Sequence, residues 1–560
     1  MTRKLWLKRT VSALALAATV LGAAGLAGAR HASAARSATL YHQTAHVLNY
    51  PNVGLDWPDS FDPANVEDSQ SIQVVDMLYA NLVRLNVQNQ VVPDLATWDV
   101  SPDHKVYTFH LRTDARFSDG HPITADDVIY SIDRALNPHV YKGGPSPVAT
   151  TYLGHIVGAT SYKGMGDVKG LKKLDAHTVQ ITIDSPISFF LQTLTYWTAD
   201  VLEKGKTPMG GLTTKNPLQN QVSSGPWKLS KFRYRSSLTF VPNRGWYNYN
   251  KMKLREVDMP FVSSSDTAYQ GYESGQYAMS TVSPSSRLTA ARKQPDFHSI
   301  PNLAIDYISY NFAKPPFNNK ALRLAATYAI NRELIDSKVW HGGQVPLYSI
   351  VPKGIPGYDA DGKRFTPSYN PGRAKMYLAM ARKQLGKSFP SSLTIVYQNT
   401  SSDIRNEYTE LAYEWKQIGL NVKLQGVTFN TWLRHVTKPT LSLTYKGGDP
   451  WVEQLWIDDY PDAQDFTTNL MAPSSYYNVG NYNNPQFESL ITKALTARGN
   501  ERVQLYIKAS RIALNDAAWS MVGQTTSNWR WHQNITGMTM WSGEIYPVPV
   551  GRDWTNTDVQ

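Results

Sequence analysis

The pattern of hydrophobic and polar positions predicts a chain in which strands and amphipathic helices are mixed. From Lys105 to Leu111 apolar and polar residues alternate with period two, which is typical of a half-buried strand. Residues 402–418 instead place apolar side chains on one helical face. That face comprises Ile404, Tyr408, Leu411, Ala412, Trp415 and Ile418. Gly419 ends this helix, and the alternation over residues 420–424 predicts a strand directly after it. Helix and strand signals that follow one another in this way indicate α/β or α+β domains.

Thr124 predicts the start of a second amphipathic helix. Asp127 stands three residues later, and this spacing favours a capping box in which hydroxyl and carboxylate satisfy free amides and oppose the helix dipole. Asn137-Pro138 ends the helix. Its buried stripe is expected to comprise Val128, Ile129, Ile132 and Ala135.

Proline and glycine mark the remaining boundaries. Asn370-Pro371 opens a helix that runs through Lys383. A turn is expected over residues 118–122, and the Pro/Gly-rich stretches 206–226 and 342–358 are expected to be surface loops.

Composition limits the class of protein. A chain of 560 residues is too long for one core, so two or three domains are expected. Its 16 tryptophans, 32 tyrosines and 16 phenylalanines argue against disorder, because so many aromatic side chains need a core in which to be buried. The absence of cysteine excludes disulfides, thiolate metal sites and lipid attachment through cysteine. The first 34 residues carry five Lys or Arg and no acid, so the net charge without them falls from +11 to +6. No basic run follows, and we expect no nucleic-acid partner.

The N-terminal segment has the three parts of a secretory signal. A basic region containing Arg3, Lys4, Lys8 and Arg9 precedes an uncharged run over residues 11–29. Ala32-Ser33-Ala34 then supplies a small-residue cleavage site. We expect cleavage near Ala34 and an extracytoplasmic chain without a lipid anchor; the alternative is an uncleaved membrane anchor.

Motifs of common catalytic sites are missing. The sequence has no phosphate-binding G-x-x-x-x-G-K-[ST], no H-E-x-x-H and no G-x-S-x-G. The 13 histidines show no metal-ligand spacing, so neither a metal nor another cofactor is expected. Asp126-Asp127 lies in a first helical turn, where capping is the simpler explanation than acid/base catalysis. A carboxylate pair assembled from distant positions, as in a glycosidase, stays open.

A series of short blocks, in order and spacing, carries a family resemblance. The blocks are Phe61-Asp62-Pro63; Met77-Leu78-Tyr79-Ala80-Asn81-Leu82-Val83; Val92-Pro93-Asp94-Leu95-Ala96; Trp98-Asp99-Val100-Ser101-Pro102-Asp103; Phe117-Ser118-Asp119-Gly120-His121-Pro122-Ile123-Thr124-Ala125-Asp126-Asp127-Val128 with Ser131 and Arg134; Ser224-Gly225-Pro226-Trp227-Lys228-Leu229; Asn243-Arg244 with Trp246-Tyr247; and Asn311, Pro316-Phe317, Leu322-Arg323 with Ala329-Ile330-Asn331-Arg332. Together they resemble the family 5 extracellular solute-binding proteins, the oligopeptide- and dipeptide-binding receptors of bacterial ABC importers.

The resemblance implies a mixed α/β (α+β) fold of the periplasmic-binding-protein type II, cluster C, with two lobes and an extra subdomain inserted in the first lobe. Chain crossings between the lobes are expected near residues 305–309 and 527–531. The implied parts are a signal peptide (1–34), lobe I (35–84, 219–306 and 530–560), the inserted subdomain (85–218) and lobe II (307–529).

The resemblance also implies a peptide ligand that is trapped between the lobes as an added strand and passed to the permease subunits of an importer. By position, Asp459 matches the carboxylate that binds the peptide ammonium, and Asp458 competes if the register slips by one. Leu455, Trp456 and Ile457 would offer their backbone, and Glu67, Asp68 and Ser69 match the opposing strand of the cleft. Lys446 is the nearest basic group for a peptide carboxylate. We expect a monomer that is not an enzyme.

Two alternatives remain at this level. The same fold could bind oligosaccharides, in which case Asp459 would accept hydrogen bonds from hydroxyls. In a different class, a secreted hydrolase would use Asp119, Asp126 or Asp459 for acid/base chemistry.

Overall fold

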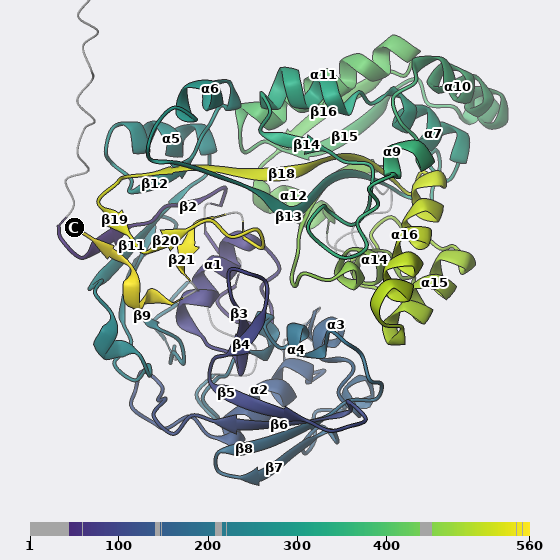
Figure 1. Cartoon of the computed structure of the whole chain (residues 1–560). Helices are drawn as coiled ribbons and strands as arrows, with labels where there is room; N and C mark the ends of the chain where they lie inside the picture. Colours follow the sequence, from purple (N-terminus) through teal and green to yellow (C-terminus); the bar gives the residue numbers. More distant parts are fainter. Residues whose placement is uncertain are drawn as a thin grey trace, which may run out of the picture. The chain divides into compact units, whose positions relative to one another are not determined.

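A computed structural model describes residues 44–560 apart from 56, 59, 141–145, 147, 208–214, 220, 437–450, 545 and 551–552. The expected signal segment, residues 1–34, and Lys446 lie outside the described residues. Strands of the described part form three larger sheets, with helices packed against them (Figure 1). No helix within that part is long and apolar enough to cross a bilayer.

The first sheet joins segments from distant parts of the sequence. Its strand order is β1-β11-β10-β9, with β2 paired to β11; β1 and β2 run parallel to β11, whereas β9 and β10 complete an antiparallel meander. Alternate strand residues are buried against helix α1 (Ser69–Leu78). The strands are β1 (Val47–Asn49), β2 (Asn52–Val53), β9 (Trp227–Arg233), β10 (Ser237–Pro242) and β11 (Glu256–Val262).

The second sheet is a four-stranded antiparallel sheet in the order β5-β6-β8-β7. Its apolar residues share a core with three helices. The strands are β5 (Ala96–Val100), β6 (Val106–Leu111), β7 (Leu171–Asp175) and β8 (Thr178–Thr182); the hairpin β3 (Val83–Leu85) and β4 (Val91–Pro93) precedes them; the helices are α2 (Ala125–Leu136), α3 (Ala149–Leu153) and α4 (Phe190–Thr193).

The third sheet contains the two longest strands, β13 (Phe297–Tyr310) and β18 (Trp519–Trp531), which pair antiparallel (Figure 1). Its order is β12-β18-β13-β17-β15-β16, and β14 pairs with β18. The other strands are β12 (Met279–Thr281), β14 (Gln344–Pro346), β15 (Leu393–Gln398), β16 (Val422–Val427) and β17 (Trp451–Ile457).

Further helices and short strands complete the described part. The helices are α5 (Ser265–Glu273), α6 (Leu288–Ala291), α7 (Lys320–Ala329), α8 (Arg332–Ile335), α9 (Gly362–Phe365), α10 (Pro371–Leu385), α11 (Ser402–Ile418), α12 (Phe429–Val436), α14 (Ala463–Met471), α15 (Pro485–Thr496) and α16 (Gly499–Asn515). The C-terminal strands are β19 (Ile535–Thr536), β20 (Met538–Thr539), β21 (Val548–Pro549) and β22 (Asp558–Val559). The backbone N–H of His46 donates to the carbonyl of Val559, so the C-terminus returns to the start of the described chain.

The elements predicted from periodicity are confirmed. Strand β6 buries alternate residues, α2 and α11 have the predicted bounds, and α10 extends two residues beyond Lys383. The predicted strand after Gly419 begins at Val422. Asp127 accepts hydrogen bonds from the Thr124 backbone N–H at 2.9 Å and hydroxyl at 2.7 Å, which is the expected capping box.

The prediction of a surface loop over residues 342–358 is wrong in part. Residues 344–346 form strand β14, which pairs with β18. Four apolar residues after it are at most 3% exposed, namely Leu347, Ile350, Val351 and Ile355. Proline and glycine signalled the irregular backbone there, but the apolar side chains between them bury the segment in the core. The other predicted loop, 206–226, falls partly outside the described residues and is buried at Ser223 and Ser224.

A buried ion pair holds the start of the first sheet's region to helix α2. Arg134 Nη1 lies 3.0 Å from Asp62 Oδ1, Nη2 binds Oδ2, and both side chains are 1% exposed. Asp62 also accepts a hydrogen bond from the Ala64 backbone. Both residues belong to the sequence blocks described above, and their contact gives those blocks a structural role.

Candidate ligand-binding cavity

One cavity collects all eight of the predicted site residues. It encloses about 1240 Å³ of empty space, including a part open to solvent. Its walls come from the start of α1, the segment after α4, helix α12, the end of β17 and the C-terminal residues 541–544. The predicted residues in its lining are Glu67, Asp68, Ser69, Leu455, Trp456, Ile457, Asp458 and Asp459.

Strand β17 presents an edge without a strand partner to this cavity. On one side it pairs with β13 along its whole length, from Trp451 to Ile457. On the other side β15 meets it only at Val452, and the carbonyl of Glu453 accepts a hydrogen bond from Trp432 Nε1 at 3.1 Å. From residue 454 onward no described strand covers that edge. Such an edge can accept an extended chain as an additional strand.

Asp459 lies two residues after the end of β17 and is held by groups from two other segments. The hydroxyl of Tyr152, at the end of α3, donates a hydrogen bond to Asp459 Oδ2. The backbone N–H of Asp459 and Nε1 of Trp456 both donate to Oδ2 of Asp465, each at 3.0 Å. Burial, followed by the nearby Asp465 carboxylate, raises the pKa of Asp459 well above its usual range. A cation placed beside Asp459 would favour its ionised form.

The facing wall is a helix start and not the expected strand. Glu67, Asp68 and Ser69 do not pair with any described strand; Asp68 caps α1 by accepting from the Ser71 N–H at 2.8 Å, and Ser69 is the first helical residue. The family match predicted a strand here, although an aspartate three residues before Ser71 is an ordinary helix-capping residue.

Glu67 is the partly buried carboxylate of this wall. Its Oε1 accepts a hydrogen bond from the Tyr476 hydroxyl at 3.4 Å, and its Oε2 has no hydrogen-bond partner among the described residues. Burial raises the pKa of Glu67 to about 8. Glu67 therefore also favours a cationic neighbour in order to ionise near neutral pH.

Aromatic side chains, of which the sequence predicted only Trp456, build much of the rest. Tyr152 stacks on Tyr196 with ring centroids 3.5 Å apart, and Trp456 meets Tyr477 edge-on at 4.7 Å. The aromatic residues of the lining are Tyr196, Trp197, Tyr307, Phe429, Trp432, Trp456, Tyr477 and Trp541. No local motif marks these positions, because they converge from segments hundreds of residues apart.

The lining is strongly acidic. Six carboxylates reach the cavity, whereas no Lys, Arg or His is found among its described lining residues. The carboxylates are Glu67, Asp68, Asp76, Asp458, Asp459 and Glu544.

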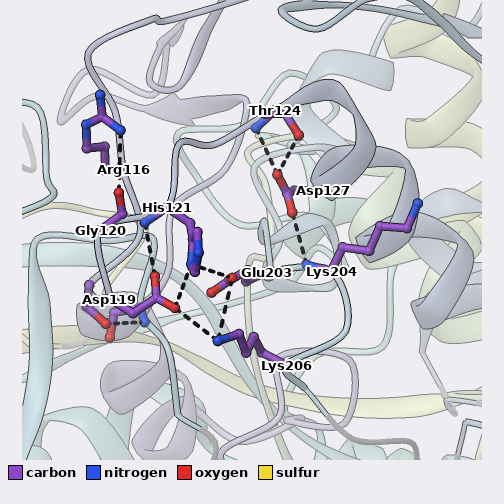
Figure 2. A network of polar contacts seen from close by, with 11 residues as sticks. Arg116, Asp119, Gly120, His121, Thr124, Asp127, Glu203, Lys204 and Lys206 are labelled. Atoms are coloured by element: carbon purple, nitrogen blue, oxygen red, sulfur yellow. Dashed lines mark hydrogen bonds and ion pairs between the residues drawn. The ribbon is translucent and has the colours of Figure 1, made fainter.

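The other two carboxylates that the hydrolase alternative would use, Asp119 and Asp126, do not lie in the cavity with Asp459. Asp126 pairs with Lys173 Nζ at 2.5 Å, and Figure 2 shows Asp119 in contact with His121 and Lys206. Hydrogen bonds from His121, acting against partial burial, lower the pKa of Asp119 to about 2. These carboxylates hold turns in place, in agreement with the structural interpretation of their sequence block.

The same network is the group of described residues that could hold a metal ion. Donor atoms of Asp119, His121 and Glu203 lie within 4.8 Å of one another. Lys206 Nζ is 3.3 Å from Asp119 Oδ2 and 4.0 Å from Glu203 Oε1 (Figure 2). A cationic side chain therefore already balances these carboxylates, and the arrangement serves to fasten the turn at Gly120 to the segment after Val201.

Comparison with protein families decides the identity of the chain. A family model described as bacterial extracellular solute-binding proteins, family 5 Middle, matches residues 90–478. The chain belongs to this family. The resemblance inferred from the sequence blocks is thereby confirmed.

Individual relatives of this family 5 solute-binding protein cover most of its length. The periplasmic oligopeptide-binding protein OppA of Escherichia coli is 29% identical over 475 residues, which are 82% of this chain and 84% of the relative. The oligopeptide-binding protein OppA of Bacillus subtilis is 23% identical and covers 87% and 90%. The structure of the murein tripeptide binding protein MppA of Escherichia coli matches with a TM-score of 0.80 and 23% identity over 92% of this chain and 99% of that one. The family 5 protein thus has the expected type II periplasmic-binding-protein fold.

Proposed function

We propose that this family 5 solute-binding protein captures peptides between two lobes and delivers them to the membrane permease of an ABC importer. The observation that carries the proposal is the position of Asp459, a half-buried carboxylate just beyond the end of a strand whose outer edge lies open to the cavity. An extended peptide added to β17 brings its terminal ammonium to this carboxylate. The two relatives named above as oligopeptide-binding proteins support the same substrate class.

Affinity without sequence specificity follows from this geometry. The backbone of Leu455, Trp456 and Ile457 hydrogen-bonds the backbone of the peptide, which every peptide offers equally. The remaining space and the aromatic walls accommodate side chains of different size. Asp459 then orients the peptide, because a desolvated ammonium without a partner would cost several kcal/mol, on the order of 3–5.

The lobes are proposed with the boundaries given by the resemblance: 35–84, 219–306 and 530–560 for lobe I, 85–218 for its insertion and 307–529 for lobe II. Strands β13 and β18 support the two crossings. Residues 297–301 of β13 pair with 526–530 of β18 beside β12, whereas residues 304–310 lie beside β17. Under the proposed boundaries, each long strand has one end in the first lobe and the other in the second.

The cellular setting belongs to the same proposal. The chain acts outside the cytoplasm after cleavage near Ala34, without a lipid anchor because the sequence has no cysteine. It works as a monomer, its partners are a peptide and the permease subunits, and it catalyses no reaction on its cargo.

Native mass spectrometry of the secreted protein tests the substrate class. Purification without refolding should yield adducts with heterogeneous peptide masses that denaturation releases. The refolded protein should then bind tetra-alanine and return it with unchanged mass after prolonged incubation. A series of carbohydrate masses would overturn the proposal in favour of an oligosaccharide receptor, and cleavage of the supplied peptide would overturn it in favour of a hydrolase.

A further inference from the structure

The cavity contains more carboxyl groups than one terminal ammonium can pair with. Six carboxylates line it, and the part of its lining that the structure describes contains no basic side chain. Asp459 is assigned to the α-ammonium in the proposed function. The other five remain, and two of them have an oxygen atom that nothing else in the described protein satisfies.

Asp458 is the more deeply buried of these two residues. Its side chain lines the cavity although the residue is only 8% exposed, and its Oδ1 is buried without a hydrogen-bond partner among the described residues. The neighbouring carboxylate of Asp459 accepts a hydrogen bond from the Tyr152 hydroxyl. The backbone N–H of Asp458 donates to the carbonyl of Leu303, but this bond does not satisfy the Asp458 side-chain Oδ1. A buried acceptor that is left unpaired costs free energy, and a buried carboxylate costs more, so a ligand that supplies a cationic donor here gains affinity.

Glu67 offers the second position on the opposite wall. Its Oε2 is likewise buried and unpartnered in the described chain, and burial raises its pKa to about 8. The Tyr476 ring, whose hydroxyl donates to Glu67, lies 5.1 Å from the Tyr477 ring, and Tyr477 meets Trp456 of β17 at 4.7 Å, so contacting side chains link Glu67 to the end of β17. A peptide bound through Asp459 therefore passes near Glu67.

We infer that the preferred ligands are cationic peptides, in which a Lys or Arg side chain near the N-terminus pairs with Asp458 and Glu67. The inference rests on the proposed function and deepens it. A neutral peptide leaves both carboxyl groups unpaired, and an acidic peptide brings a further carboxylate into a lining whose described residues include no basic side chain to pair with it. Selectivity arises from this penalty as much as from the new ion pairs.

Isothermal titration calorimetry of the intact protein with matched pentapeptides tests the inference. The peptides have free termini and an alanine background, with Lys, norleucine or Glu at the first, second or third position. Norleucine keeps the aliphatic stem of lysine and removes its charge. At one or more positions the Lys peptide should bind at least about tenfold more tightly than the norleucine peptide, and the Glu peptide most weakly.

Charge-neutral variants of the protein assign the effect to residues. Asp458→Asn and Glu67→Gln should each lower the ratio of Lys to norleucine affinity, and the double variant should bring it close to one. The readout is the ratio of the two affinities, which a uniform change in peptide binding does not alter. Asp99→Asn, at a side chain that is 82% exposed and outside the cavity, is the control and should keep the wild-type ratio.

The outcomes separate this inference from the proposal beneath it. Equal binding of Lys and norleucine peptides by the wild-type protein would overturn the cationic preference and leave peptide capture intact. A preference that survives unchanged in the double variant would overturn the assignment to Asp458 and Glu67. Failure of every peptide to bind, while the thermal unfolding transition is intact, would overturn peptide capture itself. The comparison of ligands on the wild-type protein stands even where a variant fails to fold.

Discussion

The hydroxyl of Tyr152 donates a hydrogen bond to the carboxylate of Asp459, across 307 positions of sequence. Tyr152 lies in the last turn of helix α3, which shares a core with the four-stranded sheet, whereas Asp459 comes after β17 of the seven-stranded sheet. The phenol therefore links two parts of the fold at the point where the ligand ammonium is proposed to bind. It also orients the carboxylate and supplies a donor that partly offsets the cost of burying it.

Tyr152→Phe should weaken peptide binding severalfold without unfolding the protein. Removal of the phenol takes a donor from Asp459 and makes its ionised form costlier, so the loss should be larger at pH 6 than at pH 8. Calorimetric titration with an Ala pentapeptide at the two pH values measures both effects. Tyr413→Phe, at an exposed residue, is the matched control; the same loss in both variants would contradict the role given to Tyr152.

The pH dependence of stability follows from Glu67. In the folded protein its pKa is about 8, against 4.5 for the free side chain, so the folded state binds more protons between these values. The free energy of unfolding should therefore fall as pH rises through this window. The reason is that Glu67 ionises at a lower pH in the unfolded chain than in the folded protein, so rising pH favours the unfolded chain. Thermal unfolding of peptide-free protein from pH 5 to 8.5 should show this fall, and Glu67→Gln should flatten it. An unchanged slope in the variant would show that Glu67 ionises normally.

Loss of one partner from the Asp62–Arg134 pair should be severely destabilising. Both side chains are buried, so Arg134→Met leaves an uncompensated carboxylate, and the expected cost is roughly 3–5 kcal/mol in the free energy of unfolding. Urea denaturation measures it. The double variant with Asp62→Asn should recover part of the loss, whereas additive losses would argue against a direct pair. Asp114→Asn, which breaks the exposed pair with Arg112, should cost at most about 1 kcal/mol.

Addition of the peptide as a strand on β17 predicts a periodic response to N-methylation. In a strand, alternate amides point toward a given neighbour, so methylation at amides that face β17 removes a hydrogen bond and adds a clash. A methyl scan along an Ala pentapeptide should alternate between strong and weak loss of affinity, with strong losses of at least about tenfold. A uniform small loss at every position would contradict strand addition.

Local sequence was sufficient for elements whose pattern is repeated within one segment. The buried faces of β6, α2 and α11 are where periodicity places them, because one face of each element packs against the core. The family resemblance predicted that Asp459 and its neighbours line one ligand site, and these residues line one cavity. Local signals could not place the Tyr152 hydroxyl on Asp459, or Arg134 on Asp62, because these contacts depend on how distant elements pack. The residues Glu67, Asp68 and Ser69 were expected in a strand, and the capping side chain of Asp68 instead begins a helix there.

The central claim is that Asp459 binds the terminal ammonium of the peptide. Titration of two forms of the protein with two forms of the peptide tests this claim most directly. Asp459→Asn and the wild-type protein are each titrated with an Ala pentapeptide and with its N-acetylated form. The account predicts that the substitution weakens binding of the free-amino peptide at least about tenfold more than binding of the acetylated one. Equal losses for the two peptides would contradict the assignment of Asp459 to the ligand ammonium.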